Sequence, residues 1–329
     1  MNKIKVGVIG TNTIADFLMD GISLVPGYEV VAACAATEKS VNRFAGKYNI
    51  SHKTIGYKEL AVNGLIDMVY IATPNFLHHE IAMFFLENKI AVFCEKPVAV
   101  NPTQVSEMIS ASQKNKTLLF DGIVPLYTEN LSKLSDYFKM IMPIRRCVFT
   151  LGRYSSRYDA YLRGEDPSTF RLEYCSGSLV DMGVYCVSIA VALFGKPENI
   201  QARSSKLSNG TDCLGSAIFS YDDFEVIIMH SKVSNSLIQS EVQGENGTIF
   251  IDLMNRIYNV HIQQEKGKRK KLGDTGKEGF IYQLEEFKKV FNAGKIESTI
   301  VPHKLTMDIA DVMFEMRMQS KIKYSCYGE

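Results

Sequence analysis

The chain has 329 residues, of which 46% are hydrophobic and 22% charged, which suits a globular protein with a sizeable core and two domains. Its net charge of +1 at pH 7 gives no overall attraction to nucleic acid or to an anionic membrane. The first residues lack a signal-peptide pattern, and we expect no apolar run near the roughly 20 residues that cross a bilayer.

The chain has seven cysteines, an odd number, and no two of them form a C-x-x-C pair. In a chain of this length, such cysteine usage is typical of free thiols in a reducing compartment. We therefore expect unpaired cysteines and a cytoplasmic protein.

In the first 120 residues or so, short apolar runs alternate with segments of helical periodicity. In the first helical segment we expect one buried face made of Ile14, Phe17, Leu18 and Ile22. Strands that alternate with helices at this interval predict right-handed βαβ units and a doubly wound parallel sheet. The apolar runs assigned to strands are 4–9, 28–35, 66–73, 91–94 and 117–124.

Beyond about residue 125, strand-like runs follow one another closely and are separated by turns such as Ser208-Asn209-Gly210. This spacing predicts an α+β domain with a large, open and mostly antiparallel sheet. A helix over 177–194 precedes most of the sheet, and helices over 282–291 and 303–319 end the chain. The expected strands are 144–152, 199–207, 213–221, 224–233, 238–244 and 247–254.

These patterns divide the chain into two domains. We assign 1–122 to the doubly wound domain and 123–329 to the α+β domain, and we allow the final helix to pack back on the first domain. An open antiparallel sheet exposes a large face that needs covering. We therefore expect a homodimer or homotetramer formed through this sheet.

The segment between the first strand and the first helix reads Gly10-Thr11-Asn12-Thr13-Ile14-Ala15. A dinucleotide-binding turn would read Gly-x-Gly-x-x-Gly/Ala, so Gly10 and Ala15 fit, and Asn12 replaces the middle glycine. Asparagine is the least damaging substitute where a positive φ is needed. The helix N-terminus that follows favours an anion. The loop alone leaves two interpretations open, a cofactor loop and a plain βα turn.

The second strand ends in Ala35-Ala36-Thr37, where an NAD-specific domain usually has an acidic residue that binds the ribose 2′-hydroxyl. Because no carboxylate would repel it there, the 2′-phosphate of NADP is accommodated more easily. Lys39, Ser40 and Arg43 lie just beyond. We therefore expect NADP or NAD as the cofactor, with a preference for NADP.

Three further stretches carry a family resemblance: IATPNFLHHEIA at 71–82, CEKPVAVN at 94–101 and SGSLVDMGVYC at 176–186. Their order and spacing resemble those of the Gfo/Idh/MocA oxidoreductases over essentially the whole chain. The tyrosine near the end of the third stretch, Tyr185, makes the chain resemble the subgroup of glucose–fructose oxidoreductase and dihydrodiol dehydrogenase. The resemblance implies an NAD(P)-binding Rossmann domain and a domain for substrate binding and oligomerisation. It also implies hydride transfer between nicotinamide and a secondary hydroxyl or carbonyl of a sugar, polyol or cyclic diol.

The matching residues make chemical sense as an active site. Lys96 follows the carboxyl end of a strand, where open α/β sheets bind ligands, and Asp181 and Tyr185 are spaced i, i+4 on a helix. The resemblance implies that Lys96 polarises the substrate oxygen, Tyr185 is the acid/base and Asp181 orients the substrate. Arg171 is implied to contact the substrate or to fix the helix. The plainer interpretations are a surface lysine, a helix-terminal carboxylate and a core tyrosine.

The resemblance also implies a second loop along the cofactor and a glutamate beside the nicotinamide ribose. The Glu-Lys-Pro motif is compatible with a cis bond before Pro97. The adjacent pair His78-His79 is not expected to bind a metal, because helical ligand pairs favour i, i+4 spacing. The residues implied to line the cofactor here are Thr73, Pro74, Asn75, His78, Glu95 and Lys96.

Two stretches depart from the pattern of this subgroup: Cys175-Ser176-Gly177 stands for three glycines, and Leu126 stands for an arginine. The alternative function is therefore a ligand-sensing regulator that keeps the cofactor fold without turnover. Retention of the Lys, Asp and Tyr set argues against this alternative. We expect a sugar-like small molecule as the partner, neither nucleic acid nor membrane, and a solvated strand end or loop over the basic run 266–271.

Overall fold

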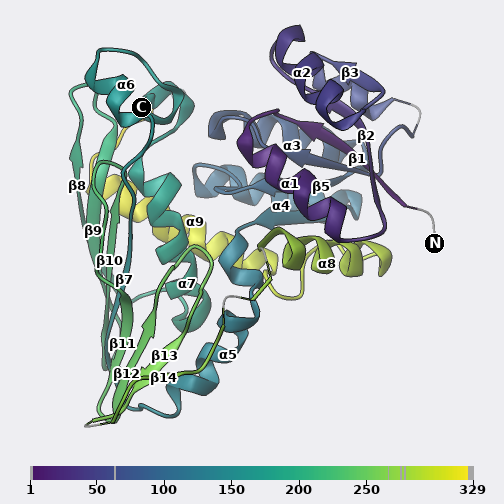
Figure 1. Ribbon diagram of the computed structural model, residues 1–329. Coiled ribbons are helices and arrows are strands. Elements are labelled where there is room, and N and C mark those ends of the chain that lie inside the picture. Colours follow the sequence, from purple (N-terminus) through teal and green to yellow (C-terminus); the bar gives the residue numbers. More distant parts are fainter. Residues whose placement is uncertain (1–2, 63, 266, 275, 278, 325–329) are drawn as a thin grey trace. The chain divides into compact units, whose positions relative to one another are not determined.

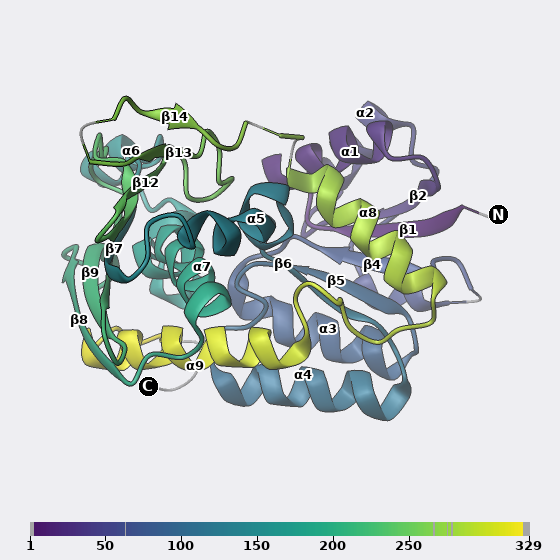
Figure 2. The ribbon, with the colours of Figure 1, turned by 90° about the horizontal axis from the view of Figure 1, so that it is seen from below.

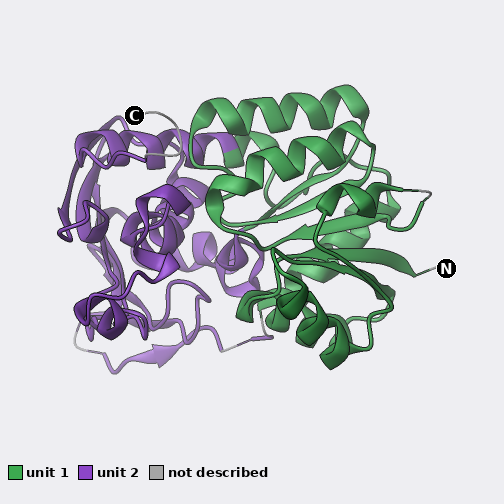
Figure 3. Ribbon diagram, turned by 90° about the horizontal axis from the view of Figure 1, so that it is seen from above, with its two compact units in different colours: residues 1–122, 278–306 green, residues 123–277, 307–329 purple. Residues whose placement is uncertain are grey.

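Figure 1 shows the computed structural model of the chain, which divides into two compact units. Unit 1 comprises residues 1–122 and 278–306, and unit 2 comprises residues 123–277 and 307–329 (Figure 3). The units change at residue 122, where the sequence places the domain boundary. Residues 278–306, however, belong to unit 1 and not to the second domain. The structure describes residues 3–62, 64–265, 267–274, 276–277 and 279–324.

Unit 1 is built on a six-stranded parallel sheet with the strand order β3-β2-β1-β4-β5-β6. The order reverses between β1 and β4, which confirms the predicted doubly wound topology. The edge strand β3 was not predicted, because only three residues form it. The strands are β1 (Ile4–Ile9), β2 (Tyr28–Cys34), β3 (His52–Thr54), β4 (Met68–Ile71), β5 (Ala91–Glu95) and β6 (Leu119–Gly122).

Helices cover both faces of this sheet, with α1, α2 and α8 on one face and α3 and α4 on the other (Figure 2). Helix α8 belongs to unit 1 because its apolar side packs there. Phe287 stacks against Phe93 of β5, and Tyr28 donates from its hydroxyl to the carbonyl of Leu284 over 2.6 Å. The elements are α1 (Thr13–Leu24), α2 (Glu38–Tyr48), η1 (Tyr57–Ala61), η2 (Asn75–Leu77), α3 (His78–Glu87), α4 (Pro102–Asn115) and α8 (Gly279–Asn292).

The buried face of α1 differs from the predicted one. Leu18 is buried as predicted, but Ala15 and Gly21 complete the core face, whereas Ile14 and Phe17 are 37% and 43% exposed. The reason is the close approach of α8, since a Cβ added to Gly21 would lie 3.0 Å from Leu284 Cδ1. Small residues therefore decide which side of α1 is buried, and a selection by hydrophobicity alone misses them.

Unit 2 contains an eight-stranded sheet in the order β14-β13-β12-β11-β7-β10-β9-β8. All neighbours are antiparallel except β7 and β10, which a long connection separates in the chain. The predicted sheet is thus confirmed. The two lysines of β14 end the basic run and are exposed, and Lys266 lies outside the described residues. The strands are β7 (Ile144–Gly152), β8 (Asn199–Lys206), β9 (Asp212–Ser220), β10 (Glu225–Ser231), β11 (Ser240–Gly244), β12 (Gly247–Ile251), β13 (His261–Gln263) and β14 (Lys270–Lys271).

The buried helix of unit 2, α7 (Val184–Phe194), packs on β7 and β10 and is entered through a π-helical turn, η6 (Leu179–Gly183). Contrary to the sequence-based expectation, the helical segment 172–194 is long and apolar enough to cross a membrane. However, 67% of its most apolar window is buried inside the structure, as in a core helix. The remaining elements are η3 (Val124–Tyr127), α5 (Glu129–Phe138), α6 (Tyr158–Leu162), η4 (Ser168–Phe170), η5 (Leu172–Tyr174) and α9 (His303–Gln319).

The other face of the unit 2 sheet carries exposed apolar side chains. On β9, Leu214 and Ile218 are 37% and 39% exposed, whereas the next residue, Phe219, points to the opposite face and is buried. Ile218 pairs with Ile227 of β10, which itself lies opposite Val148 of β7. Apolar residues therefore form a row across three neighbouring strands.

The structure also corrects the expectation for the cysteines. Cys175 is disulfide-bonded, so the prediction of free thiols is wrong for this residue. Cys326 lies outside the described residues. The free cysteines are Cys34, Cys94, Cys147, Cys186 and Cys213.

Candidate active site

The carboxyl ends of β1 and β4 meet at the loop that begins with Gly10. The φ of Gly10 is +95°, and a Cβ there would lie 2.2 Å from the carbonyl oxygen of Ala72. Only glycine fits, because the loop passes directly against the end of β4. Thr11 is buried and Thr13 begins α1. This edge is the switch point of the sheet, where open α/β folds bind their ligands.

Asn12 does not have the positive φ for which a glycine would be selected. Its backbone is extended, with φ −85° and ψ −179°, so the interpretation of Asn12 as a left-handed substitute is wrong. Its side chain is instead the N-cap of α1, since Oδ1 accepts from the N–H groups of Ile14 (2.9 Å) and Ala15 (3.3 Å). Nδ2 donates to the carbonyl of Ala72 over 2.9 Å. Asn12 thus joins the start of α1 to β4.

The end of β2 presents no carboxylate. Ala36 and Thr37 are exposed there, and the Thr37 hydroxyl oxygen caps α2 by accepting from the N–H of Ser40. Arg43 of α2 donates from Nη2 to the carbonyl of Thr11 over 3.0 Å. A guanidinium is therefore held against the β1 loop, on the edge of the sheet where β2 ends.

His78 joins two loops from inside the unit. It is 1% exposed, with Nδ1 2.8 Å from the carbonyl oxygen of Pro97 and Nε2 3.0 Å from that of Thr73. Burial lowers the pKa of His78, and the two carbonyl groups oppose this shift. Because both ring nitrogens face protein carbonyls, His78 positions the two loops and presents neither nitrogen to a ligand. The Lys96–Pro97 bond is cis, in agreement with the motif.

Thr73 and Glu95 place polar groups at the same edge. Thr73 Oγ1 is buried and has no hydrogen-bond partner within the described part of the chain. Glu95 ends β5 and accepts a hydrogen bond from the Tyr70 hydroxyl over 2.6 Å, and burial raises the pKa of its carboxyl group. The other predicted residues after β4 and β5 are Pro74, Asn75 and Lys96.

In unit 2, Asp181 and Tyr185 lie at the start of the buried helix. Asp181 is in the middle of the π-helical turn η6, and Tyr185 is the second residue of α7. Single π-helical turns are rare and occur often at functional sites. Both residues are only half-buried. The polar side of this turn therefore reaches the surface of the unit, while its apolar side enters the core.

Asp212 of β9 anchors the backbone of this turn. Its Oδ2 accepts from the N–H of Leu179 over 2.6 Å, and burial raises the pKa of its carboxyl group to about 7. A Cβ on Gly177, whose φ is +146°, would lie 1.9 Å from Asp212 Oδ1. The close approach of Asp212 therefore requires the one glycine that remains in the Cys175-Ser176-Gly177 segment.

A second anchor of the turn is His230 of β10. Its Nδ1 lies 2.8 Å from the Ser178 hydroxyl oxygen, and burial lowers the pKa of the imidazole to about 3. Gly215 on β9 leaves room for the ring, since a Cβ there would lie 2.7 Å from His230 Nε2. A neutral imidazole is therefore packed between the sheet and the start of the helix.

Lys232 is a site residue that the sequence analysis missed. It is 2% exposed, and its ammonium donates to Asp181 Oδ2 and to Thr169 Oγ1, the latter over 2.6 Å. The available signal was a lysine at the end of the apolar run FEVIIMHSKV, because lysine is almost never buried without a partner. The structure thus shows that the carboxylate of Asp181 is paired with a buried cation.

Arg171 lies in the segment that leads into the turn. Its Nε is 2.8 Å from Asp166 Oδ2, and its guanidinium carbon is 5.3 Å from the centre of the Tyr174 ring. Its carbonyl accepts from the N–H of Ser176 over 3.3 Å. These contacts suit the second of its two implied roles, fixing the start of the helix.

No group of three or more His, Cys, Asp or Glu side chains that could hold a metal ion occurs among the residues that the structure describes. The histidine pair has separate partners, since His79 Nε2 lies 2.7 Å from Glu107 Oε2 and His78 bonds to two carbonyl groups. The histidine pair therefore has structural contacts of its own.

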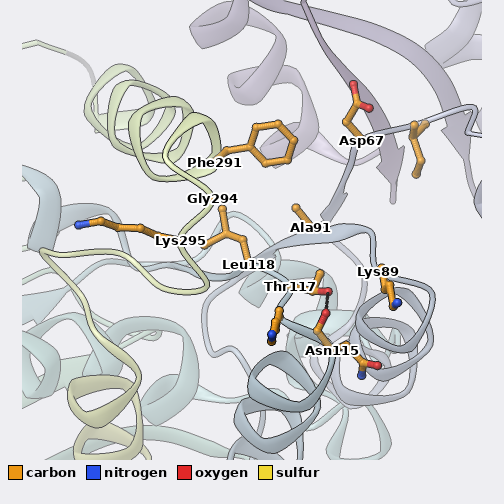
Figure 4. Close-up of a pocket in the computed structure, with 11 residues that line it drawn as sticks. Asp67, Lys89, Ala91, Asn115, Thr117, Leu118, Phe291, Gly294 and Lys295 are labelled. Atoms are coloured by element: carbon orange, nitrogen blue, oxygen red, sulfur yellow. Dashed lines mark hydrogen bonds between the residues drawn. The ribbon is translucent and has the colours of Figure 1, made fainter.

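A pocket of about 350 Å³ lies at the opposite edge of the unit 1 sheet (Figure 4). It is lined by Asp67, Ala91 and Leu118 at the amino ends of β4, β5 and β6, and by Phe291 and Lys295 at the end of α8. Its lining contains none of the predicted site residues. Because open α/β sheets bind their ligands at the carboxyl ends of the strands, we do not assign the cofactor to this pocket.

Comparisons with known proteins cover almost the whole chain. The family model described as "Oxidoreductase family, NAD-binding Rossmann fold" matches residues 4–122, and that described as "GFO/IDH/MocA C-terminal domain" matches residues 150–250. The scyllo-inositol 2-dehydrogenase (NADP(+)) IolU of Bacillus subtilis (strain 168) is 36% identical over 322 residues, which is 98% of each chain.

More distant proteins also align with almost the whole chain. The trans-1,2-dihydrobenzene-1,2-diol dehydrogenase of Xenopus laevis is 27% identical over 97% of this chain and 99% of its own. The solved structure of a 3-ketoreductase from Actinomadura kijaniata, in complex with NADP and TDP-benzene, has a TM-score of 0.86 at 18% identity. That alignment covers 97% of this chain and 98% of the other, so the two proteins share their fold.

Proposed function

Since the chain belongs to the Gfo/Idh/MocA oxidoreductase family, we propose that it transfers hydride between NADP and a ring hydroxyl or carbonyl of a cyclic polyol or sugar. The observation that carries the proposal is the set Lys96, Asp181 and Tyr185 in a chain 36% identical to a scyllo-inositol 2-dehydrogenase over 98% of both lengths. Relatives that are named dehydrogenases of polyols and diols fit an NAD(P)-dependent oxidoreductase and not a non-catalytic sensor.

The carboxyl edge of the unit 1 sheet fits a dinucleotide. The buried hydroxyl of Thr73, which has no partner within the described residues, suits a bond to a cofactor oxygen. The N-terminus of α1, beside Asn12, supplies positive charge for a pyrophosphate. At the end of β2, the missing carboxylate at Ala36 and the guanidinium of Arg43 favour the 2′-phosphate of NADP.

The protein side of the reaction needs a proton carrier, a cation and a group that orients the substrate. When bound, the nicotinamide would exchange hydride with the substrate carbon. Tyr185 moves the proton of the substrate oxygen, because a phenol both donates and accepts hydrogen bonds. The Lys96 ammonium stabilises negative charge on that oxygen. Asp181 accepts hydrogen bonds from the substrate hydroxyls next to the reacting carbon. Such charge-assisted bonds select a polyhydroxylated ring.

The test is oxidation by the purified protein of a panel of inositols, aldoses and cyclic diols, with NADP+ and NAD+ compared at equal concentration. The proposal expects reduced nicotinamide to form with at least one cyclic polyol or sugar, and faster with NADP+. Turnover of aromatic diols alone would overturn the substrate class. A preference for NAD+ would overturn the role given to Arg43.

We also propose that the exposed face of the unit 2 sheet pairs with a second copy of the chain. The row of Ile218, Ile227 and Val148 places apolar side chains on neighbouring strands of an open face, as at many protein interfaces. Ile218→Lys is expected to convert a dimer or tetramer to smaller species in sedimentation velocity. A wild-type protein that is monomeric at micromolar concentration would overturn this proposal.

A further inference from the structure

The ammonium of Lys232 is sealed inside unit 2, while the carboxylate that it contacts is not. The Lys232 side chain is 3% exposed and that of Asp181 is 39% exposed. Nζ donates to Asp181 Oδ2 and to Thr169 Oγ1, and lies 5.7 Å from the centre of the Phe170 ring. A molecule that reaches Asp181 from solvent therefore meets the carboxylate and not the lysine.

A cation at this depth needs a reason, because removing a lysine from water costs free energy that one ion pair barely offsets. Stability of the turn does not supply that reason. Asp212 already binds the N–H of Leu179, and Ser178 is already paired with His230. These two anchors hold the backbone of the first residue of the turn and the side chain of the residue before it. Lys232, in contrast, acts on the side chain of Asp181.

We propose that Lys232 is a positioning residue that fixes the carboxylate of Asp181 so that its exposed side accepts hydrogen bonds from substrate hydroxyls. The proposal rests on the proposed function, since it gives Asp181 a polyhydroxylated substrate to orient. Without Lys232, the carboxylate would lose the charge-assisted hydrogen bond that fixes Oδ2. We expect the loss to fall on substrate binding and not on cofactor binding, because Lys232 and Asp181 belong to unit 2 and the predicted dinucleotide residues belong to unit 1.

The test compares Lys232→Met, Asp181→Asn and the double variant in steady-state kinetics with the best polyol substrate. Methionine is a long, unbranched side chain without charge, so it occupies much of the buried space of the lysine without a cation. We expect Lys232→Met to raise KM for the polyol at least about tenfold, the loss typical of a charge-assisted hydrogen bond. The kcat should change less than about threefold, because uniform binding is what is lost, and the Kd for NADPH should stay constant.

The double variant separates action through Asp181 from an independent effect. If Lys232 acts through Asp181, adding Lys232→Met to Asp181→Asn causes no further rise in KM. A further tenfold rise in the double variant would overturn the proposal, as would an unchanged KM in Lys232→Met. Ser178→Ala is the matched control, because it removes an anchor of the same turn that does not touch Asp181. It should lower the melting temperature without raising KM.

Two further measurements keep the inference independent of folding defects and of the reaction. If Lys232→Met does not fold, Thr169→Val removes an acceptor of the ammonium and should raise KM about threefold; no rise would overturn the proposal. If the wild-type protein oxidises no polyol, the proposed function fails by itself. The carboxyl 13C signal of Asp181, assigned with Asp181→Asn, still tests the pair, and an identical signal in Lys232→Met and wild type would overturn it.

Discussion

The side chain of Asn12 donates from Nδ2 to the carbonyl of Ala72 over 2.9 Å, and so ties the start of α1 to the end of β4. The same side chain accepts from the N–H groups of Ile14 and Ala15. A dinucleotide loop normally has glycine here so that backbone can approach the pyrophosphate. In this chain an amide side chain stands at that place, with its oxygen turned to the helix and its NH2 group turned to β4.

Asn12→Asp tests whether this loop receives the pyrophosphate. Aspartate is as good an N-cap as asparagine but cannot donate to the carbonyl of Ala72, so the melting temperature should fall modestly while the protein stays folded. Its negative charge would repel a diphosphate, and we expect calorimetry to give an NADPH affinity at least about tenfold weaker. Asn12→Ser is the uncharged control and should bind NADPH much more tightly than Asn12→Asp. Equal affinities in wild type and Asn12→Asp would place the pyrophosphate elsewhere.

Ala36→Asp tests the coenzyme preference. A carboxylate at the end of β2 can accept from a ribose 2′-hydroxyl but repels a 2′-phosphate. We therefore expect NADPH affinity to fall at least about tenfold and NADH affinity to rise. Ala36→Asn has the same size without the charge and should leave the preference close to that of wild type. If Ala36→Asp leaves the ratio of the two affinities unchanged, Ala36 does not lie beside the adenosine ribose.

Tyr185→Phe tests the acid/base role. Removing the hydroxyl should lower kcat at least about 100-fold, within the range that general acid–base catalysis contributes. NADPH should bind as it does to the wild-type protein, because the predicted cofactor residues lie in unit 1 and Tyr185 lies in unit 2. Steady-state kinetics and calorimetry on the same preparation measure both. An unchanged kcat would remove Tyr185 from the mechanism.

His230 makes a specific prediction about stability and pH. Burial lowers its pKa from 6.5 to about 3, so the folded state holds it neutral while the unfolded chain takes up a proton below pH 6.5. Its contribution is therefore full above pH 6.5 and is lost as the pH falls toward 3. Between pH 7 and 5 the loss amounts to about 2 kcal/mol.

Urea unfolding of wild type and His230→Gln at several pH values measures this term. The variant should be less stable at pH 8, because it loses the contact with the Ser178 hydroxyl. The difference should narrow as the pH falls to 5, since the variant has no imidazole to protonate. The Asp212 carboxyl, whose pKa is raised to about 7, is common to both proteins, so its opposite contribution cancels in the comparison. A difference that is constant with pH would contradict a buried, neutral His230.

Much of the fold follows from local patterns. The apolar run 4–9 coincides with β1, and the periodicity over 303–319 coincides with α9. Those segments have strong alternation or helical spacing that neighbours in space do not override. The buried face of α1 was not predictable in this way, because it depends on Gly21 meeting Leu284 of α8, far along the chain. Periodicity registers large apolar residues and not the absence of a side chain.

The site residues that belong to short sequence motifs were predictable. Those that reach the site only through tertiary contacts were not. Lys96, Asp181 and Tyr185 come from short motifs. His230 lies in β10 and Lys232 directly follows it, about 50 residues after Ser178 and Asp181, which they contact. These contacts appear only when β10 is placed beside the turn that leads into α7. The conformation of Asn12 was missed because a side-chain cap on extended backbone and a left-handed turn are both open to asparagine.

The central claim is that hydride moves between the ring carbon of a polyol or sugar and NADP on this protein. The most direct measurement incubates the purified chain with NADP+ and C-deuterated inositols and aldoses, and analyses the nicotinamide by mass spectrometry. The account predicts reduced NADP that carries deuterium taken from a ring carbon. Tight binding of NADPH with no deuterium transfer from any of these substrates would contradict it, and would make the chain a binding protein on a dehydrogenase fold.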